Sequence, residues 1–488
     1  MRTPVLVLGT IAIGNCVFAQ QPAISDPPEV RTPFTLTAVY DSAAAHNAFF
    51  YDGKMVPPVI RVSPGGVIKV HYVNNLPVKS NEECATSPCS NMSNLHFHGL
   101  HVSPNRPQDD VLSMMSMPGE ALDYTVEIPV DAPPGLYWYH THPHGVSARQ
   151  DLDGMSGAIV IEGIDRYYPQ LRGMRERVIV LRDENIEHRD KAGLEQIEHQ
   201  LEIPSRPCGT ATEQKIERVF TANGEIRPRI AINPGEHQFW RIVNASPDRY
   251  ADIQLGSEPM EIVALDGVPL NYHERGRGKR KVDHILVAPA GRVEAIVTGP
   301  RSGSSATLAT RCIDTGPDGD ANPSMVIADV GTADVTSPTH AVPASKEAAV
   351  YKEPSARKIR ALETSTPDYT VTFTEDKKGF YINGHKFAMN DAPMLRVKVG
   401  SMRHWRVVNA TKELHPFHIH QVHFLAYAEN GVRSSSPEWL DTVNVPYGNG
   451  TADLIMDFTD PIIKGISLFH CHLLTHEDKG MMAKILFE

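Results

Sequence analysis

Four pairs of histidines, with one residue between the members of each pair, are the most informative feature of this sequence. The pairs are His96 and His98, His140 and His142, His418 and His420, and His470 and His472. In a β-strand, residues i and i+2 project from one face, so each pair presents two imidazoles to the same point. Imidazole suits copper, zinc, iron or nickel. One such pair is explained equally well by surface or hydrogen-bonded histidines, whereas four pairs predict a metal centre.

The fourth pair indicates that one strand serves two metal sites. Cys471 lies between His470 and His472, so strand alternation turns its side chain to the opposite face. The polypeptide backbone would then link a site on one face to a site on the other.

The residues that could complete the site of Cys471 are two further histidines and a methionine. His415 has the opposite parity to His418, so in an extended chain it points away from the histidine pair. His415, Cys471 and His476 with a weak axial Met481 form the His₂Cys and thioether set of a blue-copper electron-transfer site. A zinc site would not need the methionine.

The N-terminus predicts an export signal over residues 1–19. Arg2 precedes an apolar run from Val5 to Ile13, and small or branched residues at 17–19 suit a signal peptidase. This run is shorter than the ~20 residues of a membrane-spanning helix, and no later segment qualifies. We therefore expect a secreted or periplasmic protein without a membrane span.

The cysteines fit an exported protein. Five of the six remain once the signal is removed, and with Cys471 assigned to metal the other four would pair as disulfides. Four cysteines leave three possible connectivities, of which we expect Cys84 with Cys89 and Cys208 with Cys312. Two buried thiols are the alternative for the second pair.

The chain contains three copies of one pattern. A glycine is followed nine residues later by an asparagine in residues 65–74, 235–244 and 400–409. Each stretch predicts a turn followed by an alternating strand. The repeated strand-end position of the asparagines favours a structural role over glycosylation.

These repeats predict three domains of one kind. Short strands between Gly and Pro turns, without long helical periodicity, indicate an all-β chain of antiparallel sandwiches. We expect domains at about residues 27–165, 166–335 and 367–488, and a linker rich in Pro, Ala, Ser and Thr at 336–366.

A second repeated element starts at Gly135, Gly291 and Gly465. On this alignment, the middle copy has Ile296 and Thr298 where the outer copies have histidine pairs. We therefore expect the middle domain to bind no copper.

The composition indicates a globular protein and bears on its partners. The 488 residues are 41% hydrophobic and 22% charged, which is typical of a soluble globular chain. The net charge of −11 argues against nucleic acid as a partner.

The motifs resemble all four copper-binding motifs of three-domain multicopper oxidases, which include laccases and bacterial copper-efflux oxidases. They read HFHG from His96, WYHTHPHG from Trp138, HPFHIHQ from His415 and HCHLLTHEDKGMM from His470. The resemblance covers essentially the whole mature chain and implies three cupredoxin-like Greek-key β-sandwich domains.

The resemblance also implies four copper ions and a ligand for each position. The type 1 copper would be held by His415, Cys471, His476 and Met481, the type 2 copper by His96 and His418, and the type 3 pair by His98, His140, His142, His420, His470 and His472.

The implied activity is a copper-dependent oxidation of phenolic or aromatic amine donors, one electron at a time, coupled to four-electron reduction of O₂ to water. Glu477 and Asp109 match acidic positions near the copper cluster, so we expect them to supply protons. A structural, hydrogen-bonded carboxylate is the alternative for both, and Asp110 is an adjacent alternative to Asp109. We expect a monomer whose partners are O₂ and an electron donor.

Other functions compete with this one. A metal-ion oxidase acting on Cu(I), Fe(II) or Mn(II) in copper tolerance would use the same ligands, and Met114, Met115 and Met117 could form a Cu(I) site, although core packing is the simpler explanation. The extended Met-rich insertion of copper-efflux oxidases is not evident. A copper-binding protein without turnover would not need the full ligand set, and a copper nitrite reductase would leave four histidine pairs unexplained.

Three histidines lie beside the motifs but exceed the ligand count. They are His101, His144 and His423. Supporting or surface roles are expected for them.

Overall fold

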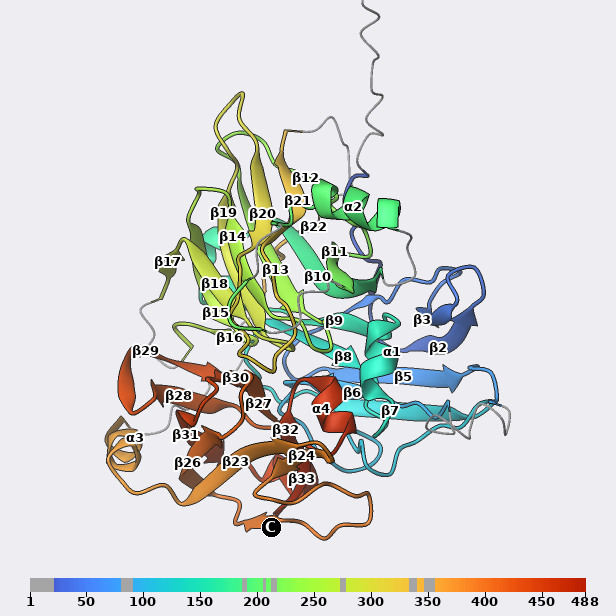
Figure 1. Ribbon diagram of the computed structural model, residues 1–488. Helices are drawn as coiled ribbons and strands as arrows, with labels where there is room; N and C mark the ends of the chain where they lie inside the picture. The colour runs from blue at the N-terminus through green and yellow to red at the C-terminus, as the bar shows by residue number, and fades with distance from the viewer. Residues whose placement is uncertain are drawn as a thin grey trace, which may run out of the picture.

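The computed structural model describes residues 22–79, 91–186, 191–204, 208–211, 217–272, 278–332, 340–345 and 356–488. β-Sheets dominate these residues, and short helices lie at their margins (Figure 1). We call residues 27–165, 166–335 and 367–488 the first, middle and third units. The predicted signal segment, Cys84 and Cys89 lie outside the described residues.

The first unit is a sandwich of two sheets. One sheet has the strand order β3-β2-β5-β7, with β2 at Phe34–Asp41, β3 at His46–Phe50, β5 at Val67–Asn74 and β7 at Ala121–Glu127. The other has the order β1-β4-β9-β8-β6, with β1 at Glu29–Val30, β4 at Val59–Val62, β6 at His96–His98, β8 at Leu136–His140 and β9 at Ser156–Ile161. Helix α1, Ser147–Leu152, follows β8. Along β5, Ile68, Val70 and Tyr72 are buried and Lys69 and His71 are exposed, which is the alternation that predicted this strand.

The middle unit has the same two layers. Its first sheet has the order β11-β10-β13-β19-β15-β16, with β10 at Arg175–Asn185, β11 at Arg218–Ala222, β13 at His237–Asn244, β15 at Met260–Leu265, β16 at Val268–Pro269 and β19 at Arg292–Thr298. Two short strands join its margins, β17 at Arg280–Val282 and β22 at His340–Ala341. The second sheet has the order β12-β21-β20-β14-β18, with β12 at Arg229–Ala231, β14 at Ala251–Leu255, β18 at His284–Val287, β20 at Ala306–Thr310 and β21 at Met325–Gly331. Helix α2 spans Lys191–Gln200.

The third unit repeats the arrangement again. Its first sheet has the order β24-β23-β26-β31-β28-β29, with β23 at Tyr369–Asp376, β24 at Gly379–Ile382, β26 at Ser401–Asn409, β28 at Phe424–Glu429, β29 at Val432–Leu440 and β31 at Gly450–Phe458. The second has the order β25-β33-β32-β27-β30, with β25 at Leu395–Val397, β27 at His415–Ile419, β30 at Thr442–Val445, β32 at Gly465–Cys471 and β33 at Met482–Phe487. Helix α4, Leu474–Asp478, belongs to this unit, and helix α3, Ala356–Glu363, precedes it in the chain. None of the helices in the described part of the chain is long and apolar enough to cross a membrane.

The repeated asparagines hold equivalent turns in the three units. The side-chain amide of Asn74 donates to two backbone carbonyls, and its oxygen accepts from the backbone N–H two residues later. Asn244 and Asn409 make the same three bonds. The structural interpretation of these residues is therefore supported.

The expected antiparallel sandwiches are wrong in strand direction at three places in the first unit and at two in each of the others. The parallel pairs are β1 with β4, β2 with β5 and β4 with β9, then β10 with β13 and β12 with β21, and finally β23 with β26 and β25 with β33. The chain crosses between the two sheets, as in a Greek key, so neighbouring strands can run the same way. Alternation of side chains does not report strand direction.

The alignment of the second repeated element is also wrong for the middle unit. β19 pairs with β13 as β7 pairs with β5, so it does not correspond to β8 or β32. The true counterpart is β20, where Thr310 lies opposite Ile253 as His140 lies opposite His96. A glycine turn followed by an alternating strand occurs in both sheets, so the sequence pattern aligned β19 with β8 and β32 although it lies in the other sheet. On the corrected alignment Cys312 takes the place of His142.

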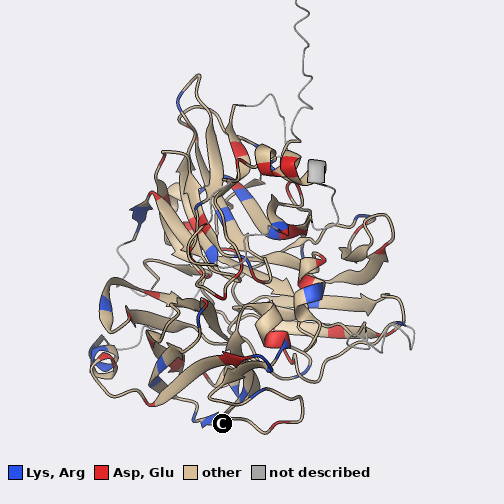
Figure 2. Cartoon of the chain, in the orientation of Figure 1, with Lys and Arg blue, Asp and Glu red and all other residues tan. Residues whose placement is uncertain are grey.

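The units share buried surfaces. Leu136 and Trp138 of the first unit belong to one buried cluster with Val178 and Val243 of the middle unit, and Tyr250 of the middle unit packs into the core of the third. Parts of the expected linker are also anchored: β22 pairs with β10, and Ile359 of α3 is buried against the third unit. Acidic and basic residues are interspersed along the chain in all three units (Figure 2).

Candidate metal centres

Two pairs of adjacent strands bring the four histidine pairs together. β6 pairs with β8 so that His96 lies opposite His140, and β27 pairs with β32 so that His418 lies opposite His470. Rings from the two outer units stack with 3.9 Å between centroids, His96 on His420 and His98 on His418. All eight histidines are buried. We call these eight residues the histidine cluster; it lies between the first and third units.

One subset of the cluster has converging ring nitrogens. Nε2 of His470 lies 3.5 Å from Nε2 of His142 and 3.1 Å from Nε2 of His420. This set contains a histidine from the first unit and two from the third, so a metal bound there would bridge the two units.

The remaining members lie directly beside this subset. The ring centroids of His98, His140 and His472 are 5.0 to 5.8 Å apart. Those of His96 and His418 are 6.2 Å apart.

The cluster contains buried nitrogens that lack hydrogen-bond partners among the described residues. They are Nε2 of His96, His140, His418 and His472, and Nδ1 of His98 and His472. In four of these rings the other nitrogen is hydrogen-bonded: that of His96 to Asp109, His98 to Asp441, His140 to the Thr141 carbonyl and His418 to the Asp441 carbonyl. Buried polar atoms are rarely left unpaired, so a group of free nitrogens fits a bound metal.

The protonation of the cluster also suits metal binding. Burial lowers the pKa of His98, His140, His142, His418, His420 and His472 well below the usual value, and that of His470 to about 3. These imidazoles are therefore neutral, which is the form that ligates metals.

A second site lies on the other side of β32. Nδ1 of His415 lies 3.2 Å from Sγ of Cys471 and 3.3 Å from Nδ1 of His476. These three residues, which we call the thiol site, are buried, and Cys471 is the free cysteine among the described residues. The parity argument is thus supported, since Cys471 faces His415 while its neighbours face the histidine cluster.

Met481 is held beside the thiol site. The N–H of Cys471 donates to the Met481 carbonyl at 3.1 Å, and the N–H of Met481 donates to the His476 carbonyl at 2.9 Å. Met481 is fully buried in the same core cluster as Cys471. Its role as an axial ligand stays a prediction.

Asp109, rather than Asp110, reaches the histidine cluster. Asp109 accepts hydrogen bonds from Nδ1 of His96 at 3.0 Å, the N–H of Phe97 at 2.9 Å and Nε2 of Gln421 at 2.7 Å. Asp110 instead accepts from the N–H of Ser113 within its own loop.

Glu477 lies against the opposite side of the cluster. Its Oε2 is 3.5 Å from Nδ1 of His470 and 3.6 Å from Nε2 of His142, and its Oε1 accepts from Ser147 at 3.3 Å. Burial raises the pKa of Glu477 well above the usual value, so the carboxyl can retain a proton.

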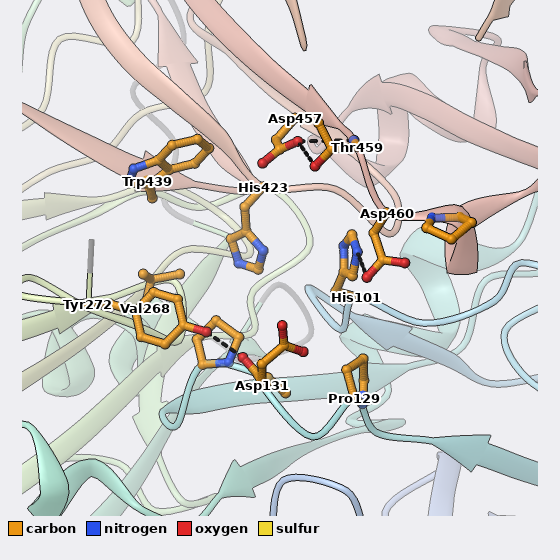
Figure 3. Close-up of a pocket in the computed structure, with 13 residues that line it drawn as sticks. His101, Pro129, Asp131, Val268, Tyr272, His423, Trp439, Asp457, Thr459 and Asp460 are labelled. Atoms are coloured by element: carbon orange, nitrogen blue, oxygen red, sulfur yellow. Dashed lines mark hydrogen bonds and ion pairs between the residues drawn. The ribbon is translucent and has the colours of Figure 1, made fainter. Parts of the chain in front are cut away.

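The three surplus histidines contact neither site. His101 pairs with Asp460 at 3.3 Å, His144 packs on Phe387, and His423 donates to the Asp266 carbonyl at 3.1 Å. His101 and His423 line a cavity of about 370 Å³ at the meeting of the three units (Figure 3). The methionines do not gather into a site, because Met114 is buried in the core of the first unit while Met117 is 44% exposed.

Sequence reasoning missed two buried residues next to the cluster. The Asp441 carboxylate accepts from Nε2 of His98 at 3.2 Å, and Arg292 of the middle unit forms an ion pair with Asp441 at 2.5 Å. No short motif connects either residue to the histidines.

Cys208 and Cys312 form the expected disulfide, with 5.7 Å between their Cα atoms. The alternative of two thiols is excluded for this pair. The bond joins the end of β20 to the segment before β11.

Comparisons with known proteins agree with this arrangement. Models of the multicopper oxidase family match residues 35–165, 137–311 and 360–488. A multicopper oxidase of Staphylococcus aureus is 24% identical over 90% of this chain and 83% of its own, and a laccase of Haloferax volcanii is 28% identical over 80% and 67%. The structure of a multicopper oxidase from Campylobacter jejuni, described as a metallo-oxidase, superposes with a TM-score of 0.70 at 21% identity, covering 96% of this chain and 95% of that one.

This chain belongs to the multicopper oxidase family and is an oxidoreductase enzyme. The family implies copper as its metal, and the cupredoxin-like β-sandwich fold expected from the motifs is confirmed.

Proposed function

We propose that this enzyme oxidises phenolic or aromatic amine donors by single electrons and reduces O₂ to water, using four copper ions. The observation that carries the proposal is the pair of sites on the two sides of β32: three converging ligands around Cys471, and eight buried histidines around His470 and His472. When bound, copper supplies one-electron redox chemistry at the first site and reduction of O₂ at the second.

The family resemblance implies which residues would hold each copper ion. His415, Cys471, His476 and Met481 would hold the type 1 copper, His96 and His418 the type 2 copper, and the other six histidines the type 3 pair. The converging nitrogens of His142, His420 and His470 support one ligand set of the type 3 pair, and the unpartnered Nε2 atoms of His96 and His418 are available to a further metal ion.

The backbone provides a short route between the two sites. Cys471 is covalently joined to His470 and His472, so its sulfur and each imidazole would be linked through two side chains and the one peptide unit between them. This arrangement separates donor oxidation from O₂ reduction without a mobile carrier.

Two carboxyl groups serve the histidine cluster from different sides. Glu477 holds a proton within reach of His142 and His470, and we assign it the delivery of protons to reduced oxygen. Asp109 hydrogen-bonds to His96 and so orients that ring, and its supply of protons to the cluster stays a prediction.

A copper count tests the proposal. The purified protein should contain about four copper ions per chain and consume O₂ in the presence of a phenol. Clearly fewer copper ions in an active protein would exclude the trinuclear centre, and full copper without O₂ consumption would exclude the enzyme activity.

A metal-ion donor is a second candidate, favoured by a carboxylate at the edge of the thiol site. Oε1 of Glu413 lies 3.4 Å from Nε2 of His476. Burial and a hydrogen bond with Glu375 raise the pKa of Glu413 to about 10. A cation next to His476 would displace the proton that keeps Glu413 neutral and take the two carboxylates as oxygen ligands.

Paired substrates separate the two donors. Steady-state kcat/KM should be measured for a phenol and for Fe(II), Cu(I) and Mn(II). The wild type is compared with Glu413→Gln and with the control variant Glu438→Gln. Glu438 is a suitable control because its carboxylate forms an ion pair with Arg280. A selective loss of metal-ion oxidation in Glu413→Gln favours the second candidate, and activity on metals alone excludes the phenol oxidase.

We also propose that the protein works outside the cytoplasm, in the secreted or periplasmic fraction. The Cys208–Cys312 disulfide supports this location, since such bonds persist in oxidising compartments. Fractionation of the producing cells tests it, and full-length protein in the cytoplasm would contradict it.

A further inference from the structure

Arg292 connects the middle unit, which contributes none of the histidines, to the histidine cluster. The residue starts β19 and its side chain is fully buried. Its guanidinium donates to Oδ1 and Oδ2 of Asp441 in the third unit, at 2.8 and 2.5 Å, and to the Leu136 carbonyl in the first unit at 3.3 Å. One side chain therefore makes contact with both other units.

Asp441 extends this contact to two histidines of the cluster. Its Oδ1 accepts from Nε2 of His98 at 3.2 Å, and its backbone carbonyl accepts from Nδ1 of His418 at 2.8 Å. The other nitrogen of each ring, Nδ1 of His98 and Nε2 of His418, is buried without a partner among the described residues. Because a hydrogen bond fixes which nitrogen carries the proton, it also fixes which nitrogen is free for a metal.

The surrounding backbone holds the ion pair in place. Asp266 accepts from the N–H of Arg292 at 2.9 Å and from the N–H groups of Asp441 and Thr442 at 3.3 Å. The carboxylate of Asp266 thus attaches the backbone of the middle unit to the backbone that carries Asp441.

Gly99 leaves the space that the ion pair needs. It follows His98 with φ +81°, and a Cβ at this position would overlap Oδ2 of Asp441 and Nη2 of Arg292. The ion pair therefore fills the space that a side chain at position 99 would need, directly beside His98.

We propose that Arg292 is a positioning residue for the histidine cluster: by fixing Asp441 with both arms of its guanidinium, it makes His98 and His418 present their free nitrogens to the metal. The forked guanidinium binds both carboxylate oxygens, whereas a lysine would keep the charge without this bidentate contact. This inference rests on the proposed copper-binding function of the cluster.

The experiment compares Arg292→Met and Arg292→Lys with Arg241→Met. Arg241 is the matched control, because it is another buried arginine of the middle unit with carboxylate partners, Glu176 and Glu294, but without contact to a cluster histidine. The readouts are bound copper per chain, the type 2 EPR signal and the blue type 1 absorption.

We expect Arg292→Met to retain the blue absorption while its copper falls from about four to about one per chain. Arg292→Lys should recover part of that copper with altered type 2 EPR hyperfine splitting. Arg241→Met should match the wild type in all three readouts. Full copper and an unchanged type 2 signal in Arg292→Met would overturn the proposal.

Two further variants decide the matter if Arg292→Met does not fold, as judged by circular dichroism. Gly99→Ala and Asp441→Asn disturb the same junction without removing the arginine, and either should change the type 2 signal. Unchanged copper and EPR in both folded variants would reject the positioning role. If the wild type itself lacks the trinuclear copper, the proposed function fails instead.

Discussion

The Nδ1 atom of His415 lies 3.2 Å from the sulfur of Cys471, although 56 residues separate them in the chain. Burial raises the pKa of Cys471 well above the usual value, so the thiolate is stable only with a cation beside it. Serine cannot supply that thiolate. Cys471→Ser should therefore lose the blue absorption and about one copper ion per chain but keep the type 2 EPR signal. A variant that remains blue would show that Cys471 is not the ligand.

Glu477→Gln removes a proton from the edge of the cluster while preserving the size of the side chain. We expect O₂ consumption to slow by about 100-fold or more, because a positioned acid–base group typically contributes about 10²- to 10⁴-fold. The blue absorption and the anaerobic reduction of the type 1 copper by a donor should not change. Unaltered steady-state turnover would remove Glu477 from the mechanism.

Met481→Leu tests the axial position of the thiol site. A thioether stabilises the oxidised copper more than an aliphatic side chain does, so its loss should raise the type 1 reduction potential. Redox titration of the blue absorption gives the direction. A lower potential would mean that Met481 is not axial.

The Cys208–Cys312 disulfide should stabilise the middle unit. It closes a loop with a sequence separation of 104, for which the loop-entropy model gives about 4–5 kcal/mol. The double variant Cys208→Ser/Cys312→Ser should unfold at a lower temperature in calorimetry. Its blue absorption before unfolding serves as the control, and an unchanged unfolding profile would contradict the expected stabilisation.

The histidine positions were predictable because strand alternation has a period of two. Parity alone predicts that Cys471 faces away from His470 and His472, and in the structure its sulfur lies beside His415 while His470 contacts His420. The same periodicity could not distinguish β19 from β20, since both present an alternating strand after a turn. The sequence pattern therefore aligns Ile296 with His140, whereas in the structure Thr310 occupies the position equivalent to His140.

The residues that sequence reasoning missed depend on the meeting of three units. Arg292 and Asp441 are 149 residues apart, and Asp441 lies 343 residues from His98. Neither residue has a spacing that marks it beforehand. Such contacts follow from how the sandwiches pack together, which local pattern does not encode.

The placement of the ligands has a consequence for biosynthesis. His142 and His470 are 328 residues apart in the chain, yet their Nε2 atoms lie 3.5 Å from each other. The first unit supplies four of the eight cluster histidines, so a nascent chain that has not reached residue 418 contains only half of the cluster. A metal ion held by histidines of both outer units can therefore bind only after the third unit has been synthesised, so metal loading would follow synthesis of both units.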